Sequence, residues 1–443
     1  MAAAGIGADS GGDSYLPASG NGGYAASAYD LDLKYRVGTN RLTANATITA
    51  TATEALSRFS LDLVGLRVSR VLVDNRRAVF RQSATKLRVT PELPVAAGAE
   101  FVVSVAYAGA PQPRRTRWGR LGWEELDDGL LVASQPSGAP TWFPCNDHPA
   151  DKATYRIRFE TEAAYRVVCN GLLTRFHSAG GRGHWLYEQA EPTSTYLATV
   201  QIGRYSAIEL SPADVQTTLY FPPALGRAAR ADFADVPRMI ETFERAFGPY
   251  PMASYGIVVT ADELEIPLEA QGLAVFGSNH VDGHGASERL VAHELAHQWF
   301  GNSVGVGVWR DIWLNEGFAC YAEWIWSEAS GSVSADALAH QFRAELARLP
   351  MDLRIGDPGP ARMFDDRVYK RGALTLHAVR LTVGDVAFFD LLHAWTTRHR
   401  HGTASTGDFV ELAESRTGTA LRPLFDAWLY SEALPLLPAT PAR

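Results

Sequence analysis

The sequence predicts an α+β protein of two domains, an N-terminal antiparallel β domain followed by a mostly helical domain with a small sheet. Three observations lead to this prediction. The chain has 443 residues, too many for one ordinary hydrophobic core. Between residues 30 and 105, apolar and polar side chains alternate with a period of two, as in half-buried strands. After residue 229, the apolar spacing becomes that of amphipathic helices.

The composition narrows the class of protein. An apolar content of 46% and a charged content of 20% are those of a soluble globular chain. A net charge of -8 offers no basic footprint for nucleic acid. No stretch approaches the length of a membrane span, and the first residues lack the basic and apolar regions of a secretory signal. Three widely spaced cysteines argue against a disulfide framework, so we expect a cytoplasmic protein that does not bind membranes.

The first domain is expected over residues 25–205. Residues 1–24 are rich in Gly, Ala and Ser without periodicity, which predicts a disordered tail. Alternation and turn residues then predict successive strands, and the β pattern ends near Tyr205. The expected strands cover residues 31–35, 42–50, 59–63, 71–73, 86–89 and 101–105.

The second domain is expected over residues 206–436, with a tail over 437–443. A helix over 229–247 should stop at Gly248, and a strand over 256–260 and an acidic loop over 262–273 should follow. Two helices are expected around residues 288–300 and 309–330, and Gly331 is typical of a helix C-terminus. Further helical patterns cover residues 335–349, 371–383 and 420–430.

The run from His293 to His297 carries the chemistry. Residues four apart lie on one helix face, so His293 and His297 can point two imidazoles at one metal, with Glu294 beside them. A catalytic zinc site takes three protein ligands and a water, and Glu316, early in the next helical pattern, is the candidate third ligand. Two other interpretations are a hydrogen-bonded pair of core histidines and a structural zinc, which usually needs four Cys or His ligands.

These residues resemble the signature of a known family. The pattern His293-Glu294-x-x-His297, followed by eighteen residues and then Glu316, is similar to that of the gluzincin zinc aminopeptidases (peptidase family M-one), which include alanyl aminopeptidases and leukotriene A hydrolase. The resemblance covers residues 24 to 436. It implies a thermolysin-like catalytic domain, one zinc ion per chain, and removal of single residues from the free N-terminus of peptides. The length implies a short form without the family's C-terminal helical domain.

The resemblance also assigns substrate-binding and catalytic residues. Glu269 matches the carboxylate of the family's Gly-x-Met-Glu-Asn motif and Gln135 matches a position that helps hold the substrate amine, although Ala270 stands where the motif has Asn. Glu263 and Glu265 are rival candidates for the amine. Tyr369 matches the tyrosine that stabilises the oxyanion, in a segment where Lys370 and Arg371 depart slightly from the family pattern.

The predicted mechanism follows from these roles. Zinc would lower the pKa of a water, Glu294 would act as general base and then acid, and Tyr369 would share the oxyanion charge. Glu323 is a candidate partner for a zinc-binding histidine, with a surface carboxylate as the other interpretation. The alternatives for function are an endopeptidase or an epoxide hydrolase on the same site, or an inactive homologue that acts as a binding protein. The preferred first residue and the oligomeric state are left open.

Overall fold

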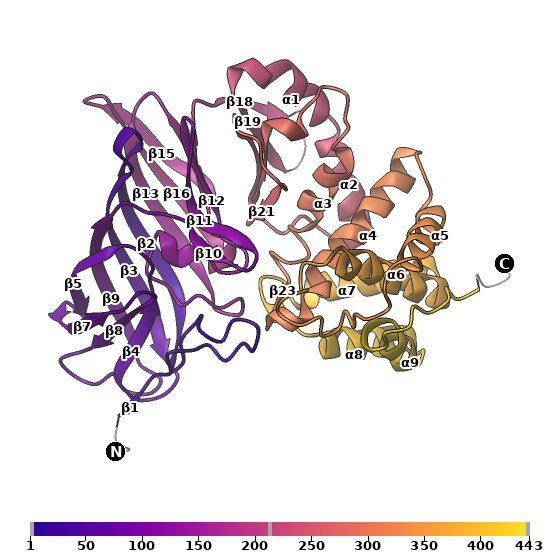
Figure 1. Ribbon diagram of the computed structural model, residues 1–443, viewed down its shortest axis with the longest axis horizontal. Helices are drawn as coiled ribbons and strands as arrows, with labels where there is room; N and C mark the ends of the chain where they lie inside the picture. Colours follow the sequence, from indigo (N-terminus) through magenta and orange to yellow (C-terminus); the bar gives the residue numbers. More distant parts are fainter. Residues whose placement is uncertain (1–3, 211–214, 440–443) are drawn as a thin grey trace. The chain divides into compact units, whose positions relative to one another are not determined.

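The computed structural model describes residues 4–210 and 215–439, which form two compact units (Figure 1). The first unit contains the described residues up to Ile208 together with 218–226 and 253–279. The second contains 227–252, everything described from His280 onward, and the described residues between 209 and 217. The predicted domain boundary at residue 205 lies near Ile208, where the chain first passes from the first unit to the second. However, the segment 253–279, which we assigned to the second domain, groups with the first unit.

The first unit is built from β-sheets, as the alternating pattern predicts. Along β2, the side chains of Leu31, Leu33 and Tyr35 are buried while their neighbours are more exposed, so one face of the strand packs in the core. The largest sheet is antiparallel except where β13 runs parallel to β2. Its order is β15 (Leu172–Ala179), β16 (Arg182–Ser194), β13 (Lys152–Glu162), β2 (Tyr24–Arg36), β3 (Arg41–Ala52), β9 (Glu100–Gly109), β5 (Arg67–Val73) and β6 (Arg76–Arg77).

Three further sheets have four or five strands each. One has the order β1 (Gly5–Ile6), β4 (Leu56–Asp62), β8 (Lys86–Thr90) and β7 (Val79–Gln82). The second has β10 (Arg114–Thr116), β11 (Gly119–Leu126), β12 (Gly129–Ala133), β17 (Val200–Gly203) and β14 (Arg166–Cys169). The third has β18 (Ser206–Leu210), β19 (Gln216–Phe221), β20 (Ser254–Val259), β22 (Leu273–Phe276) and β21 (Leu268–Ala270).

The N-terminal segment is ordered, which corrects the prediction of a disordered tail over residues 1–24, of which 1–3 lie outside the described residues. Strand β1 pairs with β4, and Tyr15 is buried. The buried carboxylate of Asp62 accepts hydrogen bonds from the Gly20 amide and the Asn21 side chain, and Lys86 donates to the Gly20 carbonyl. Polar contacts to distant residues hold this segment, and such contacts leave no apolar periodicity in the sequence.

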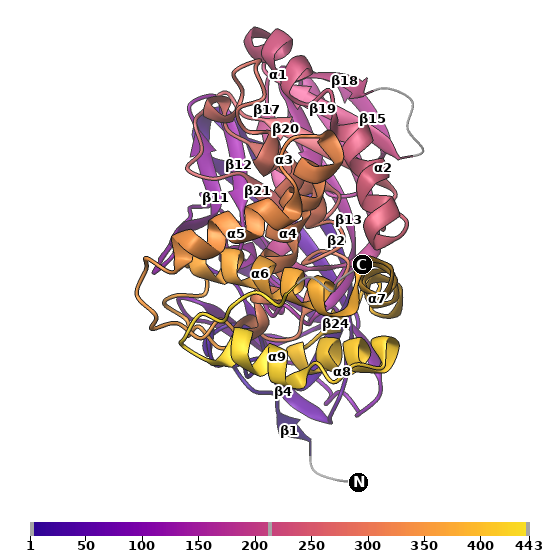
Figure 2. The same ribbon diagram turned by 90° about the vertical axis from the view of Figure 1, so that its right-hand side faces the viewer.

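The second unit is helical, as predicted. Figure 2 shows α5, α6, α8 and α9 of this unit, and α6 packs on both α4 and α5. The one predicted helix over 229–247 is two helices, because Pro237 starts a new first turn at α2. The helices are α1 (Gly226–Asp232), α2 (Val236–Phe247), α3 (Glu288–Ala296), α4 (Trp313–Ser330), α5 (Ala335–Leu346), α6 (Asp366–Val383), α7 (Asp385–Arg398), α8 (Thr406–Thr417) and α9 (Arg422–Phe425).

Short elements connect these helices and strands. Strands β23 (Gly305–Val306) and β24 (Thr403–Ala404) pair in parallel. A π-helical turn, η7 (Asp426–Tyr430), follows α9, and the remaining short helices are of the 3-10 type. These are η1 (Val37–Thr39), η2 (Ala139–Thr141), η3 (Thr195–Leu197), η4 (Pro223–Leu225), η5 (Ser278–His280) and η6 (Trp309–Asp311). None of the helices within the described ranges has the length and hydropathy needed to cross a bilayer.

Candidate active site

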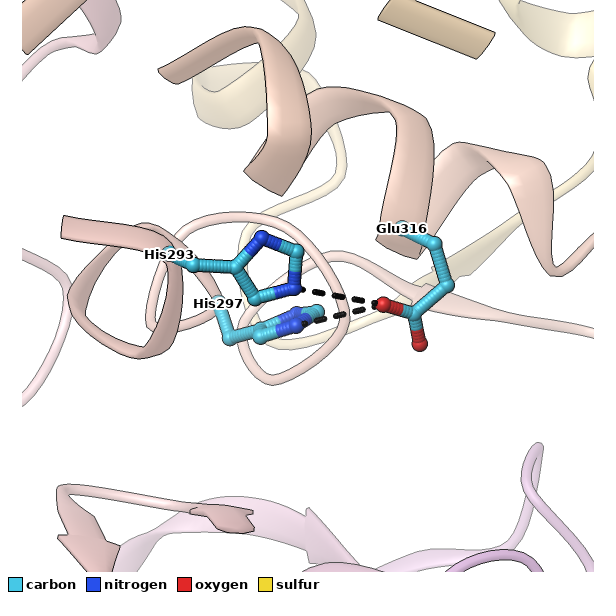
Figure 3. A group of neighbouring side chains, drawn as sticks. All are labelled: His293, His297 and Glu316. Atoms are coloured by element: carbon cyan, nitrogen blue, oxygen red, sulfur yellow. Dashed lines mark ion pairs between the residues drawn. The ribbon is translucent and has the colours of Figure 1, made fainter. Parts of the chain in front are cut away.

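The two histidines of the HExxH motif converge with Glu316 in the second unit. His293 lies in α3, and His297 directly follows its last residue with helical backbone angles. The Nε2 atoms of His293 and His297 lie 3.5 Å and 3.4 Å from the same carboxylate oxygen of Glu316. Figure 3 shows the two rings and the carboxylate pointing toward one another. The structure therefore brings together the three side chains predicted as metal ligands.

The helices place Glu316 through a close crossing of α4 and α6. Glu316 sits in the first turn of α4 and is buried. Its neighbour Gly317 packs against Gly372 of α6 so closely that a Cβ built on Gly317 would lie 2.8 Å from the Gly372 Cα. A side chain at either position would separate the helices. The two glycines thus set the spacing between the helix that carries Glu316 and the helix that carries Tyr369.

Outer partners orient both imidazoles. The Nδ1 atom of His293 lies 2.7 Å from a carboxylate oxygen of Glu323, and the Nδ1 atom of His297 lies 3.0 Å from the Phe300 carbonyl oxygen. Because these oxygens only accept, each ring donates from Nδ1, and in the neutral imidazole this leaves the lone pair of Nε2 for the shared centre. Glu323 is buried and also accepts from Arg289 at 2.9 Å. It is thus a partner of a histidine and not a surface carboxylate.

The site favours a cation. Burial alone would lower the pKa of His293, but hydrogen bonds to Glu316 and Glu323 raise it to about 9. Burial would raise the pKa of Glu316, but His297 and His293 lower it to about 2, so this carboxylate is ionised. Two imidazole nitrogens and a carboxylate oxygen, all within 4.8 Å of one another, match the ligand set and spacing of a catalytic zinc site. The residues present therefore fit zinc.

Glu294 supplies a reactive group beside these ligands. Its side chain is buried, and its Oε2 atom has no hydrogen-bond partner among the described residues. Burial raises the pKa of Glu294 above its ordinary value, while the nearby histidines act in the opposite direction. A buried carboxylate oxygen that lacks a hydrogen-bond partner lowers the stability of the fold unless a substrate or a water donates a hydrogen bond to it. The arrangement suits a general base.

Tyr369 lies in the first turn of α6, beside the histidines. Its ring centroid is 6.1 Å from that of His293, with the ring planes 23° apart. The side chain is half-buried. The structure therefore places the predicted oxyanion tyrosine next to one of the predicted metal ligands, within the same unit.

Gln135 and Glu269 come together in the first unit. The Gln135 amide donates to a carboxylate oxygen of Glu269 at 2.5 Å, across 134 residues of sequence. Glu269 lies on β21, and both residues line a small pocket with Tyr196 and Thr199. The rival acids Glu263 and Glu265 are exposed and do not line this pocket. The geometry favours Glu269 for binding a cationic group.

Two supporting residues were not predicted from the sequence. Arg289 lies one helical turn before His293 and holds the second oxygen of Glu323. Lys370 donates to the Cys320 sulfur at 3.4 Å and lies 3.8 Å from Glu323. Arg289 stands four residues before His293, and this spacing is the one signal that could have indicated it.

Comparisons with known proteins match both parts of the chain. A family model described as the Peptidase M1 N-terminal domain matches residues 25–197, and one described as the Peptidase family M1 domain matches residues 232–428. The crystal structure of the M1 zinc metallopeptidase from Deinococcus radiodurans is 32% identical with a TM-score of 0.89, covering 97% of this chain and 99% of that one. The chain belongs to the M1 peptidase family. The predicted family resemblance and fold class are confirmed.

Further relatives show how widely the M1 likeness extends. A variant of the Deinococcus radiodurans enzyme, bound to a Tyr-Ser-Ala substrate, has a TM-score of 0.90 and 32% identity over 97% of this chain and all of that one. The probable aminopeptidase 2 of Sulfurisphaera tokodaii is 25% identical, and the leucyl aminopeptidase of Saccharolobus solfataricus is 23% identical, each over 85% of this chain. The chain spans about half the length, 50%, of these two curated relatives.

Proposed function

We propose that this M1 family member is a zinc aminopeptidase that releases single residues from the free N-terminus of peptides. The observation that carries the proposal is the convergence of His293, His297 and Glu316 next to a buried oxygen of Glu294 that has no hydrogen-bond partner among the residues described. The Deinococcus radiodurans relative of the same fold and family is a zinc metallopeptidase, which supports zinc as the metal.

In the proposed site, His293, His297 and Glu316 would hold one zinc ion. Zinc supplies a Lewis acid and a water of lowered pKa. Glu294 accepts a proton at Oε2 and later delivers it to the leaving amine, a role for which its raised pKa suits it. The Tyr369 hydroxyl donates to the developing oxyanion of the scissile carbonyl. Glu323 and the Phe300 carbonyl keep both imidazoles in the orientation that binds metal.

The exopeptidase specificity is assigned to Glu269 and Gln135. An enzyme that removes one residue must bind an ammonium, and a carboxylate does so with a charge-assisted hydrogen bond. The Gln135 amide donates to one oxygen of Glu269 at 2.5 Å and so holds this carboxylate in place beside the pocket that both residues line. The Tyr-Ser-Ala substrate bound to the Deinococcus radiodurans variant supports peptides as the substrate class.

The test is a panel of fluorogenic aminoacyl amides, each assayed with a free and with an N-acetylated amine, with and without a chelator. We expect hydrolysis of the free-amine compounds that zinc restores after chelation. Equal rates on acetylated compounds would indicate an endopeptidase, and an inert panel with bound zinc would indicate an epoxide hydrolase or a binding protein. The panel also reports the preferred first residue.

We also propose that the protein works in the cytoplasm. Cys145, Cys169 and Cys320 are all buried and free, which suits a reducing compartment. Fractionation of cells that express the chain at its natural level tests this location, and recovery from outside the cytoplasmic fraction contradicts it.

A further inference from the structure

Arg371 is a buried cation whose partners are all main-chain oxygens. It lies on α6, two residues after Tyr369, and in the described part of the chain no carboxylate pairs with it. Its guanidinium nitrogens donate to six backbone carbonyl oxygens at 2.7 to 3.4 Å. These belong to Ala427, Trp428, Ser431, Glu432, Ala433 and Leu353.

Five of the six acceptors lie in one segment at the end of the described chain. This C-terminal segment, residues 427–433, starts in η7 and continues past its last residue. The last carbonyls of a helix have no partner within the helix and carry the negative end of its dipole. Arg371 supplies the donors and the positive charge that these carbonyls need, so one side chain joins α6 to the C-terminal segment.

The residues on either side of Arg371 fix the same turn of α6 to other elements. Lys370 donates to the Cys320 sulfur on α4 and lies over the ring of Phe342 on α5, 4.7 Å from its centroid. Gly372 contacts Gly317 of α4. Three consecutive residues thus hold the turn that carries Tyr369, and Arg371 is the one that attaches it to the C-terminal segment.

We propose that Arg371 is a positioning residue that sets the place of the Tyr369 hydroxyl by holding the first turns of α6 against the C-terminal segment. The inference rests on the proposed function, because it assigns Arg371 a role through Tyr369. A lysine at this position keeps the charge but donates from one nitrogen, so it cannot reach carbonyls spread around a planar guanidinium. A small displacement of a catalytic group, on the order of 1 Å, costs about a hundredfold in rate.

The test measures kcat and KM of R371K on an unblocked aminoacyl amide, alone and combined with Y369F. We expect kcat to fall at least about tenfold with KM near the wild-type value, because a positioning defect acts in the transition state. In the Y369F background, R371K should lower kcat no further, since the group through which it acts is absent. The matched control is R343M, which removes a 2.7 Å bond from α5 to the Pro435 carbonyl and should leave kcat unchanged.

The outcomes separate the inference from the proposed function. A normal kcat in R371K, or a loss that persists in full in the Y369F background, overturns the inference and leaves the zinc site intact. A near-normal kcat in Y369F overturns the role of Tyr369 and the inference with it. Zinc content per chain reports folding. If R371K purifies without zinc, G356A replaces R371K in the test, because a Cβ at position 356 would collide with the ring of Tyr430, which belongs to the C-terminal segment.

Discussion

Glu294 is the residue whose surroundings most directly indicate chemistry. Its Oε2 atom is buried without a partner among the described residues, next to three side chains that fit a zinc ion. We expect E294Q to bind zinc with near-normal stoichiometry and to lose about 10²- to 10⁴-fold in kcat, the usual contribution of a general base. Metal analysis and steady-state kinetics on the same sample check both parts. Turnover within a few-fold of wild type would remove Glu294 as the base.

Glu269 carries the prediction about the substrate amine. We expect E269Q to lower kcat/KM on free-amine compounds by about tenfold or more, the loss of a charge-assisted hydrogen bond, while changing acetylated compounds little. E263Q and E265Q are matched controls, because these acids closely precede β21 in the chain but are exposed and outside the pocket of Gln135 and Glu269. If either control shows the larger loss, the amine-binding assignment moves to that residue.

At the scale of elements, the α4–α6 crossing depends on two glycines. A Cβ built on Gly372 would lie 2.7 Å from the Gly317 Cα, and both groups are backbone, which cannot turn aside. We expect G372A to lower the free energy of unfolding by about 1–3 kcal/mol. We also expect it to reduce zinc affinity, because Glu316 lies on α4 and would be displaced with that helix. G407A is the control, because a Cβ there meets only the Ser405 hydroxyl at 3.6 Å. Urea unfolding and zinc titration compare the two, and equal stabilities would contradict a tight crossing.

In the first unit, a buried ion pair joins β4, β8 and the N-terminal segment. The Lys86 Nζ lies 2.7 Å from Asp62, both side chains are about 5% exposed, and Lys86 also donates to Gly20 and Asn21. Removing one partner leaves the other charge buried, which costs about 3–5 kcal/mol. We therefore expect K86M to unfold at much lower urea than wild type. K34M breaks a pair whose lysine is 58% exposed and should cost less than about 1 kcal/mol.

At the scale of the whole molecule, the features predicted correctly from the sequence are those that leave a periodic pattern or a fixed spacing of residues. The alternation of Leu31, Leu33 and Tyr35 indicated β2, and the four-residue spacing of His293 and His297 indicated their shared direction. The order of the N-terminal segment was not predictable, because Asp62 and Lys86 hold it through contacts that leave no local pattern. The grouping of residues 253–279 with the first unit was likewise not predictable, because it depends on tertiary contacts that leave no local pattern.

The residues of the candidate site likewise fall into those that a sequence pattern indicates and those that it does not. His293, His297, Glu294 and Glu316 follow from motif spacing, and Glu269, Gln135 and Tyr369 were reached through the family resemblance. The roles of these seven residues stay predictions. Arg289 and Arg371 were not found, because their partners are a distant carboxylate and backbone carbonyls. Main-chain acceptors have no residue type and cannot appear in a sequence pattern.

Metal removal should have a local effect on stability, because all three proposed ligands come from α3, its C-cap and α4 of the second unit. A ligand that binds the native state at a thousand times its Kd stabilises it by about 4 kcal/mol. We expect a chelator to lower the unfolding midpoint and to speed amide exchange in α3 and α4, while β2 and β3 of the first unit exchange at unchanged rates. H293A should show the lower midpoint from the start and no response to the chelator. An equal response in H293A would place the stabilising metal elsewhere, and no response in the wild type would remove zinc from this site.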